Sequence, residues 1–199
     1  MFTGIIQHIG VVEGNENGRL AISCSNILGE LTVGESIAIN GVCLTLEKAH
    51  VKQRMTLFFG VGPETQKITT IGSLTLAQRV HVERALSLSA LIGGHMVQGH
   101  VDGVGIIDGL KSDNESLFVR IACPSTLTQF CVEKGSITVD GVSLTINTLN
   151  ENFFEVCLIP HSLANTNLKN AQLGDRVNIE CDMVGKYIHK FVHAMKMRS

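Results

Sequence analysis

Hydrophobic and polar residues alternate along most of the chain in short runs that are typical of β-strands. Each run is rich in β-branched residues and is bounded by Gly, Asn or Asp. The clearest runs lie at residues 36–39, 42–46, 79–83, 136–139 and 176–180. Asn40-Gly41 and Asp140-Gly141 each separate two apolar runs, which is a strong signal for a β-hairpin. The pattern therefore predicts an all-β protein.

The strand pattern occurs twice. Residues 36–46 (SIAINGVCLTL) align with residues 136–146 (SITVDGVSLTI), and six of these eleven positions are identical. A second block, residues 63–83, aligns with residues 160–180. Three glycines near the start also recur in order, Gly4, Gly10 and Gly14 matching Gly99, Gly105 and Gly109. This period far exceeds the ~20–50 residues of a solenoid repeat, so each copy should be a small domain.

Short strands at this spacing close into a small barrel or pack as a sandwich. We expect a six-stranded Greek-key barrel in each half, produced by an internal duplication, with a pair of β-sandwiches as the alternative. The predicted domains are residues 1–94 and 95–183, followed by a helical tail at 184–199.

The tail has a different period from the rest of the chain. Its apolar residues recur at helical spacing, with Lys and His on the other face. The apolar residues are Val184, Tyr187, Ile188, Phe191, Val192 and Met195. A helix outside both copies has to bury this stripe on another subunit or on its own barrel. We expect subunit assembly, and a helix that caps its own barrel is the alternative.

Composition and charge exclude several classes of protein. Hydrophobic residues make up 44% of the 199 residues and the net charge is −2, so neither disorder nor a basic surface for nucleic acid is expected. The longest apolar stretch breaks at Gly93-Gly94, which predicts no membrane span. The six cysteines lack metal-ligand spacing, and Met1 leads into the chain without a basic leader. We therefore expect reduced thiols in a cytoplasmic protein without a metal site.

Polar groups recur at one repeat position. Cys43 and Ser143 are equivalent, and each is followed two residues later by a threonine, Thr45 or Thr145. Alternation places each pair on one strand face, where it could line a pocket for a flat heterocycle or belong to a hydrogen-bonded barrel interior. If two such pockets face each other, they could hold two copies of one small molecule.

The segment at residues 93–103 (GGHMVQGHVDG) is the densest functional candidate. Its glycines let a backbone approach a ligand closely, and imidazole titrates near neutral pH. His100 is the candidate acid or base, whereas His95 fits a turn cap. Phosphate-binding glycine loops, GxSxG elbows and CxxC pairs are missing, which argues against nucleotide-phosphate sites, serine hydrolases and zinc ribbons.

These residues resemble the riboflavin synthase family of the trimeric, alpha-chain type. The resemblance covers nearly the whole chain in order. Its motifs are MFTG at residues 1–4, NGVCLT at 40–45, VERAL at 82–86, the segment at 93–103, KGSITVDGVSLT at 134–145, LIPH at 158–161 and GDRVNIE at 174–180. The first copy departs from the family at residues 77–81 (AQRVH), where the pattern is Gly-Asp-x-Val-Asn.

The resemblance implies a dismutation. Two molecules of 6,7-dimethyl-8-ribityllumazine react by four-carbon transfer to give riboflavin and 5-amino-6-ribitylamino-2,4(1H,3H)-pyrimidinedione, without cofactor or metal. One substrate would lie in the N-terminal barrel of one subunit and the other in the C-terminal barrel of its neighbour. The family also implies a homotrimer built around the C-terminal helix and an association with lumazine synthase. A non-catalytic lumazine- or flavin-binding antenna protein of the same fold is the alternative, and a reductase-type flavin barrel is a more distant one.

The family's binding residues carry over to both halves. The first pocket would be lined by Gly4, Ile5, Cys43, Thr45, Gly60, Gly62 and Thr65. The second would be lined by Gly99, Val101, Lys134, Val142, Ser143, Leu144, Ile159, Pro160, His161 and Ser162. Further contacts would come from Phe2, Thr3, Ile6, Leu44, Val61, Pro63, Glu64, His100, Leu158 and Leu163.

Catalytic roles follow from the same resemblance. We expect His100 with Ser143 to remove a proton from the C7 methyl group of one lumazine. Thr145 and Asp182 would orient them. The other lumazine would accept a nucleophile supplied or assisted by Cys43, Ser36 or water.

Overall fold

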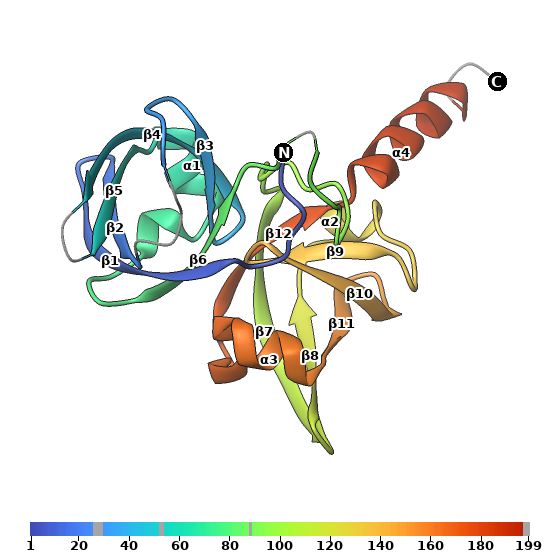
Figure 1. Ribbon diagram of the computed structural model, residues 1–199. Helices are drawn as coiled ribbons and strands as arrows, with labels where there is room; N and C mark the ends of the chain where they lie inside the picture. Colours follow the sequence, from blue (N-terminus) through green and yellow to red (C-terminus); the bar gives the residue numbers. More distant parts are fainter. Residues whose placement is uncertain (26–29, 52–53, 88, 197–199) are drawn as a thin grey trace.

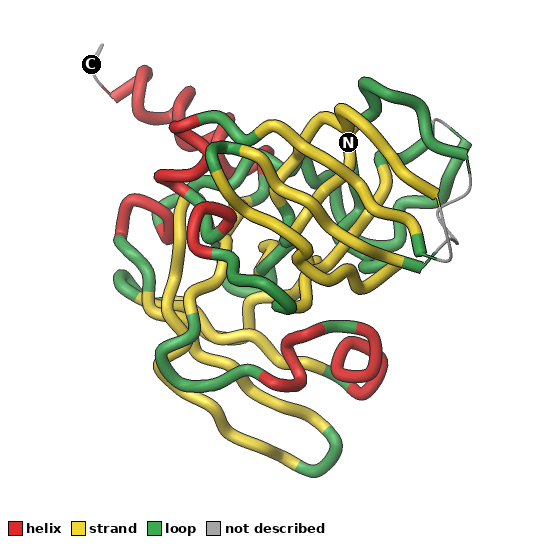
Figure 2. Tube along the Cα trace, turned by 90° about the vertical axis from the view of Figure 1, so that its left-hand side faces the viewer, coloured by secondary structure: helices red, strands yellow, loops and turns green. Residues whose placement is uncertain are grey.

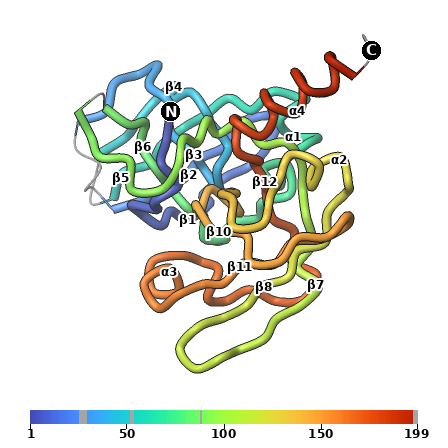
Figure 3. Tube along the Cα trace, turned by 90° about the vertical axis from the view of Figure 1, so that its right-hand side faces the viewer, coloured from blue at the N-terminus to red at the C-terminus, as the bar shows by residue number. Residues whose placement is uncertain are grey.

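Two closed β-barrels lie side by side in the computed structural model, which describes residues 1–25, 30–51, 54–87 and 89–196 (Figures 1 and 3). Each barrel has six antiparallel strands. The first contains β1 (His8–Glu16), β2 (Arg19–Cys24), β3 (Ser36–Ile39), β4 (Val42–Val51), β5 (Met55–Gly60) and β6 (Arg79–Arg84). The second contains β7 (Gly103–Asp113), β8 (Ser116–Ala122), β9 (Ser136–Val139), β10 (Val142–Leu149), β11 (Phe153–Leu158) and β12 (Arg176–Cys181). Closure confirms the barrel prediction and excludes the pair of sandwiches.

The strand order confirms the duplication. Around the first barrel the order is β1-β2-β5-β4-β3-β6, and around the second it is β7-β8-β11-β10-β9-β12. Both predicted hairpins are present, joining β3 to β4 and β9 to β10. Their central residues have positive φ, 43° and 76° at Asn40 and Gly41 and 47° and 79° at Asp140 and Gly141. Asn, Asp and Gly are the residues that tolerate this geometry.

Side chains fill the interior of both barrels. Val42, Leu44 and Leu46 point inward from β4 and are at most 5% exposed, and alternate residues of the other strands complete the core. The second barrel has the same arrangement. A ligand therefore has to bind on the outside of the barrels.

Short helices follow the same strand in each copy. α1 (Pro63–Ile68) comes after β5 and α3 (Pro160–Asn165) after β11, each followed by a 3-10 turn, η1 (Ile71–Ser73) or η2 (Asn167–Asn170). Each helix begins with a proline, which fixes φ at the first helical position. Proline lacks an N–H, and a helix needs no backbone donor at that position. The short helix α2 (Ser125–Thr128) precedes β9.

The predicted tail helix is α4 (Met183–Lys196), and it projects away from the second barrel (Figures 1 and 2). Its apolar stripe stays exposed, from 46% at Val192 to 72% at Met195. The stripe is therefore not buried on the chain's own barrel, which excludes that alternative. Within the described residues, no helix has the length and apolar character needed to cross a membrane.

The two barrels meet at a polar seam with approximate two-fold symmetry. The hairpin glycines are back to back, since a Cβ on Gly41 would lie 2.5 Å from the backbone nitrogen of Gly141. His81 donates from Nδ1 to the Asp140 carbonyl oxygen (2.8 Å), and its Nε2 accepts the backbone N–H of Asn167 (2.8 Å). Asn178 makes the equivalent pair of bonds in the other copy. The barrels are thus joined rigidly through matched contacts.

Candidate functional site: two matched surface sites

The repeated polar pairs lie on the outer face of each barrel. Cys43 is half-buried and Thr45 is exposed, whereas their neighbours Leu44 and Leu46 point into the core. Ser36 is opposite Thr45 on β3, so it shares this face. Ser143 and Thr145 have the same placement on β10, with Thr145 opposite Ser136. The structure therefore excludes the interpretation of these residues as barrel interior. We call the predicted binding surface around Cys43 and Thr45 the first pocket, and that around Ser143 and Thr145 the second pocket.

The segment before each barrel crosses to the other barrel. Gly4 accepts the backbone N–H of Ser143 at its carbonyl oxygen (2.8 Å), and Gly99 accepts that of Cys43 (2.9 Å). Both glycines have positive φ, 74° and 77°, and a Cβ on either would lie within 2.7 Å of the facing Cβ atom. Glycine is needed because any side chain would clash at the pocket wall.

This exchange corrects the expected composition of the pockets. We expected Gly4 and Ile5 beside Cys43, and Gly99 and Val101 beside Ser143. In the structure Gly4 contacts Ser143, and Ile6 packs on the core of the second barrel. Gly99 contacts Cys43, and Val101 belongs to the core of the first barrel. The reason is that β4 pairs with β5 only from Leu46 onward, and β10 pairs with β11 only from Ile146 onward. The crossing segments bond the strands just before these points.

Two buried glutamates hold the crossing segments in place. Glu83 accepts the N–H groups of Thr3 (2.7 Å) and Gly4 (3.2 Å), and Glu180 accepts those of Gln98 (2.8 Å) and Gly99 (2.9 Å). Burial raises the pKa of both carboxyl groups, and these N–H bonds partly oppose the rise. We did not single out either residue from the sequence. The available signal was a glutamate recurring at equivalent positions of two apolar strands.

The two crossing segments also pair with each other. Phe2 and Val97 exchange two backbone hydrogen bonds (2.7 and 3.1 Å), and both side chains are 1% exposed. They pack with Ala38 and Cys43 in a small separate cluster. Phe2 and Thr3 therefore support the pocket walls from beneath, as buried residues.

A histidine faces the serine of the second pocket. Nδ1 of His95 lies 2.8 Å from Oγ of Ser143, and Gly94 packs against the same side chain. Burial lowers the pKa of His95, and the nearby Asp182 carboxylate partly opposes this. A neutral imidazole here can accept the serine proton.

The histidine partner of Ser143 differs from the one we expected. We paired His100 with Ser143, but His95 has that position, and His100 is exposed next to Gly99 on the Cys43 side. The sequence suggested a turn cap for His95 because two glycines precede it. Gly94 instead allows the backbone to approach Thr3 and Ser143, and Gly93 packs against Ile5.

The other expected binding residues fall into two groups. Six have side chains inside the barrel cores, so only their backbone can meet a surface ligand: Leu44, Val61, Val101, Val142, Leu144 and Leu158. The rest are exposed or half-buried and lie in the N-terminal segment, around β5–α1 and β11–α3, and at Lys134: Ile5, Ile6, Gly60, Gly62, Pro63, Glu64, Thr65, Lys134, Ile159, Pro160, His161, Ser162 and Leu163.

Asp182 lies between the second pocket and α4. Its Oδ1 accepts the backbone N–H of Val184 (2.9 Å) at the start of the helix, and its charge acts on His95. Across the described residues, no group of three or more His, Cys, Asp or Glu side chains is placed to hold a metal ion.

The two barrels correspond to two copies of a known domain family. The lumazine binding domain family matches residues 3–85 and 98–182. A riboflavin synthase of Bacillus subtilis (strain 168) is 42% identical over 197 residues, covering 97% of this chain and 90% of that protein. A riboflavin synthase of Mycobacterium bovis is 40% identical over 201 residues, covering 98% and 99%.

Solved structures show the same fold. The crystal structure of LumP complexed with riboflavin has a TM-score of 0.80 at 22% identity and covers 91% of this chain and 99% of that chain. The structure of LumP complexed with 6,7-dimethyl-8-(1'-D-ribityl) lumazine has a TM-score of 0.77 over the same shares at 22% identity.

Proposed function

Because this chain belongs to the riboflavin synthase family and carries two lumazine binding domains, we propose that it makes riboflavin from two molecules of 6,7-dimethyl-8-ribityllumazine. One molecule transfers a four-carbon unit to the other, and the second product is 5-amino-6-ribitylamino-2,4(1H,3H)-pyrimidinedione. The observation that carries this proposal is the matched placement of Cys43 and Ser143 on the outer faces of the two barrels, each contacted by a crossing segment. Two like pockets suit a reaction between two copies of one molecule, since proximity and orientation can supply about 7–11 kcal/mol of a barrier.

The two pockets would play different chemical parts. At the second pocket, neutral His95 accepts the Ser143 proton, and this pair removes a proton from the C7 methyl group of the bound lumazine. The 2.8 Å contact and the lowered pKa of His95 support this role. At the first pocket, Cys43 or Ser36 assists addition of a nucleophile to the other lumazine.

The complete site would form between subunits. We propose a homotrimer in which the exposed stripe of α4 is the contact and the first pocket of one chain faces the second pocket of its neighbour. The exposed Phe191 and Met195 support this arrangement, because apolar stripes of this kind are favourable only when covered. We also propose a cytoplasmic location and an association with lumazine synthase, as the family resemblance implies.

The test is incubation of the purified protein with the lumazine as sole substrate. We expect one riboflavin to form for every two lumazines consumed. Absorbance and chromatography measure both amounts. Ser143→Ala should lower kcat about 100-fold while lumazine still binds. Tight binding by the unaltered protein without any riboflavin would contradict the proposal and favour an antenna protein.

A further inference from the structure

Two cysteine thiols face each other at the base of α4. The Sγ atoms of Cys131 and Cys181 are 3.9 Å apart, and each thiol also hydrogen-bonds the Leu127 carbonyl oxygen, at 3.7 and 3.5 Å. Cys131 follows α2, and Cys181 is the last residue of β12, separated from the start of α4 by Asp182 alone. A disulfide has an S–S distance of about 2 Å, so a movement of about 2 Å would join them.

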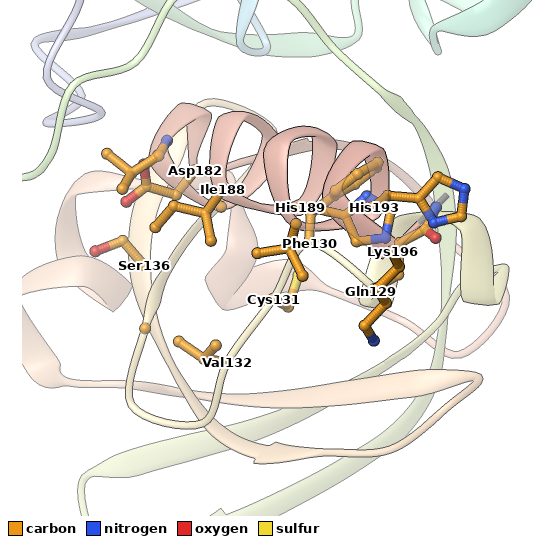
Figure 4. Close-up of a pocket in the computed structure, with 14 residues that line it drawn as sticks. Gln129, Phe130, Cys131, Val132, Ser136, Asp182, Ile188, His189, His193 and Lys196 are labelled. Atoms are coloured by element: carbon orange, nitrogen blue, oxygen red, sulfur yellow. The ribbon is translucent and has the colours of Figure 1, made fainter. Parts of the chain in front are cut away.

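The two thiols differ in accessibility. Cys181 is buried, whereas Cys131 is half-buried and lines a groove of about 420 Å³ between α4 and the turn at residues 129–135 (Figure 4). Ile188 and His189 form the helix side of this groove. On a single chain, a small oxidant that enters the groove therefore meets Cys131 before Cys181.

The more accessible thiol, Cys131, is also the more acidic one. The hydrogen bond with Cys181 lowers the pKa of Cys131, while that contact and burial raise the pKa of Cys181. Burial also raises the pKa of the nearby Cys123 thiol, to about 11. Because the thiolate is the nucleophile, Cys131 is the thiol that reacts first.

We propose that Cys131 and Cys181 are a redox-reactive pair that a peroxide converts into a disulfide at the base of α4. The Cys131 thiolate attacks a peroxide oxygen, and the O–O bond breaks. Hydroxide departs as the leaving group, and Cys131 becomes a sulfenic acid. Cys181 then loses its proton and attacks the Cys131 sulfur, and the S–O bond breaks as water departs. In total, two thiols lose two electrons and two protons, and hydrogen peroxide becomes two water molecules.

The new bond would tie the turn after α2 to the start of α4. Asp102 already fixes this region, since its carboxylate accepts the backbone N–H of Cys181 (2.8 Å) and pairs with Lys186 (2.8 Å). Cys181 is also the neighbour of Asp182, which caps α4 and acts on His95. Oxidation would thus stiffen the base of α4 and the support of the second pocket.

The direct test is peptide mapping of the peroxide-treated full chain after free thiols are alkylated. Chymotrypsin can cleave after Leu127 and Phe130, which separates Cys123 from Cys131. We expect a mass loss of two hydrogens and one linked pair of peptides that contain Cys131 and Cys181. Cys131→Ser should abolish this pair, and the matched control Cys123→Ser should keep it.

A stability measurement gives an independent readout. The oxidised protein should melt roughly 5 °C or more above the reduced protein, dithiothreitol should reverse the shift, and Cys131→Ser should show none. Cys131→Ala serves the same purpose if the serine variant does not fold. Six thiols that stay free under peroxide, a link between other cysteines, or sulfinic acid on Cys131 without a link would each overturn the proposal.

Discussion

At the scale of single residues, the contact between His95 and Ser143 decides the proposed chemistry of the second pocket. Burial lowers the pKa of His95 from its ordinary value of 6.5, with Asp182 opposing in part. A base works in its neutral form, so activity should persist at pH 6.5 and fall only as the pH drops through this lower pKa. A plot of kcat against pH is the measurement.

The variant that tests this assignment is His95→Gln. We expect a loss of about 100-fold in kcat, because the glutamine cannot take up the proton. His100→Gln is the comparison. In this variant kcat should fall at the same acidic pH as in the unaltered protein. If the fall of kcat at acidic pH disappears in His100→Gln but not in His95→Gln, His100 rather than His95 is the base that acts with Ser143.

Two glycines at the pocket walls carry a stability prediction. Gly4→Ala and Gly99→Ala each add strain at positive φ and a clash with the facing strand, so we expect losses of about 2–3 kcal/mol in the free energy of unfolding. Gly34→Ala is the matched control, because Gly34 has φ 94° but nothing within 4 Å of its Cβ position. It should cost only about 1 kcal/mol. Urea unfolding measures all three, and equal losses would contradict a clash.

At the scale of elements, α4 has an amphipathic sequence whose apolar side is uncovered. Phe191 is 62% exposed on a helix that projects away from the barrels. If this stripe joins subunits, Phe191→Glu should convert the trimer into monomers, because a charge cannot be buried there without a partner. Sedimentation velocity is the measurement, and Lys190→Glu is the control with a new carboxylate on the other face. A Phe191→Glu protein that stays trimeric would rule out α4 as the contact.

At the scale of the whole molecule, the seam between the barrels contains a buried histidine where the second copy has Asn178. Burial lowers the pKa of His81 to about 4. The unfolded chain therefore binds this proton first as the pH falls below 6.5, and stability is lost between pH 6.5 and about 4. The loss amounts to about 3 kcal/mol.

His81→Asn isolates this effect because it copies the residue at the equivalent position. Burial raises the pKa of Asp140 to about 7, so its protonation stabilises the fold as the pH falls, and Asp140 is present in both proteins. The difference in unfolding free energy between the two proteins, measured in urea across this range, should therefore shrink or reverse toward pH 4. A difference that is independent of pH would show that His81 does not titrate as argued.

The proposed site between subunits predicts complementation. Thr45→Arg would block the first pocket and Thr145→Arg the second, at matched exposed positions. Each variant alone should be inactive. An equal mixture, unfolded and refolded together, should recover about a quarter of the unaltered rate, because one neighbouring pair in four combines two intact pockets. No recovery would place both pockets of a site on one chain.

Periodicity along the chain was enough to predict much of this protein. The hairpins at residues 40–41 and 140–141, the repeated strands and the helical tail all depend on local backbone preferences and on which face a residue occupies. The repeat then implied two similar pockets with Cys43 and Ser143 at equivalent positions. These features are local, so the sequence carries them directly.

The tertiary structure alone decided how the halves exchange segments. Gly4 meets Ser143 and Gly99 meets Cys43 across long stretches of chain, and no period in the sequence encodes such a contact. The same exchange brings His95 rather than His100 to Ser143. By itself the sequence therefore determined two barrels, a tail and the residues available for chemistry. Closure of the barrels and their packing at the seam determined which of those residues face each other, because that depends on the whole fold.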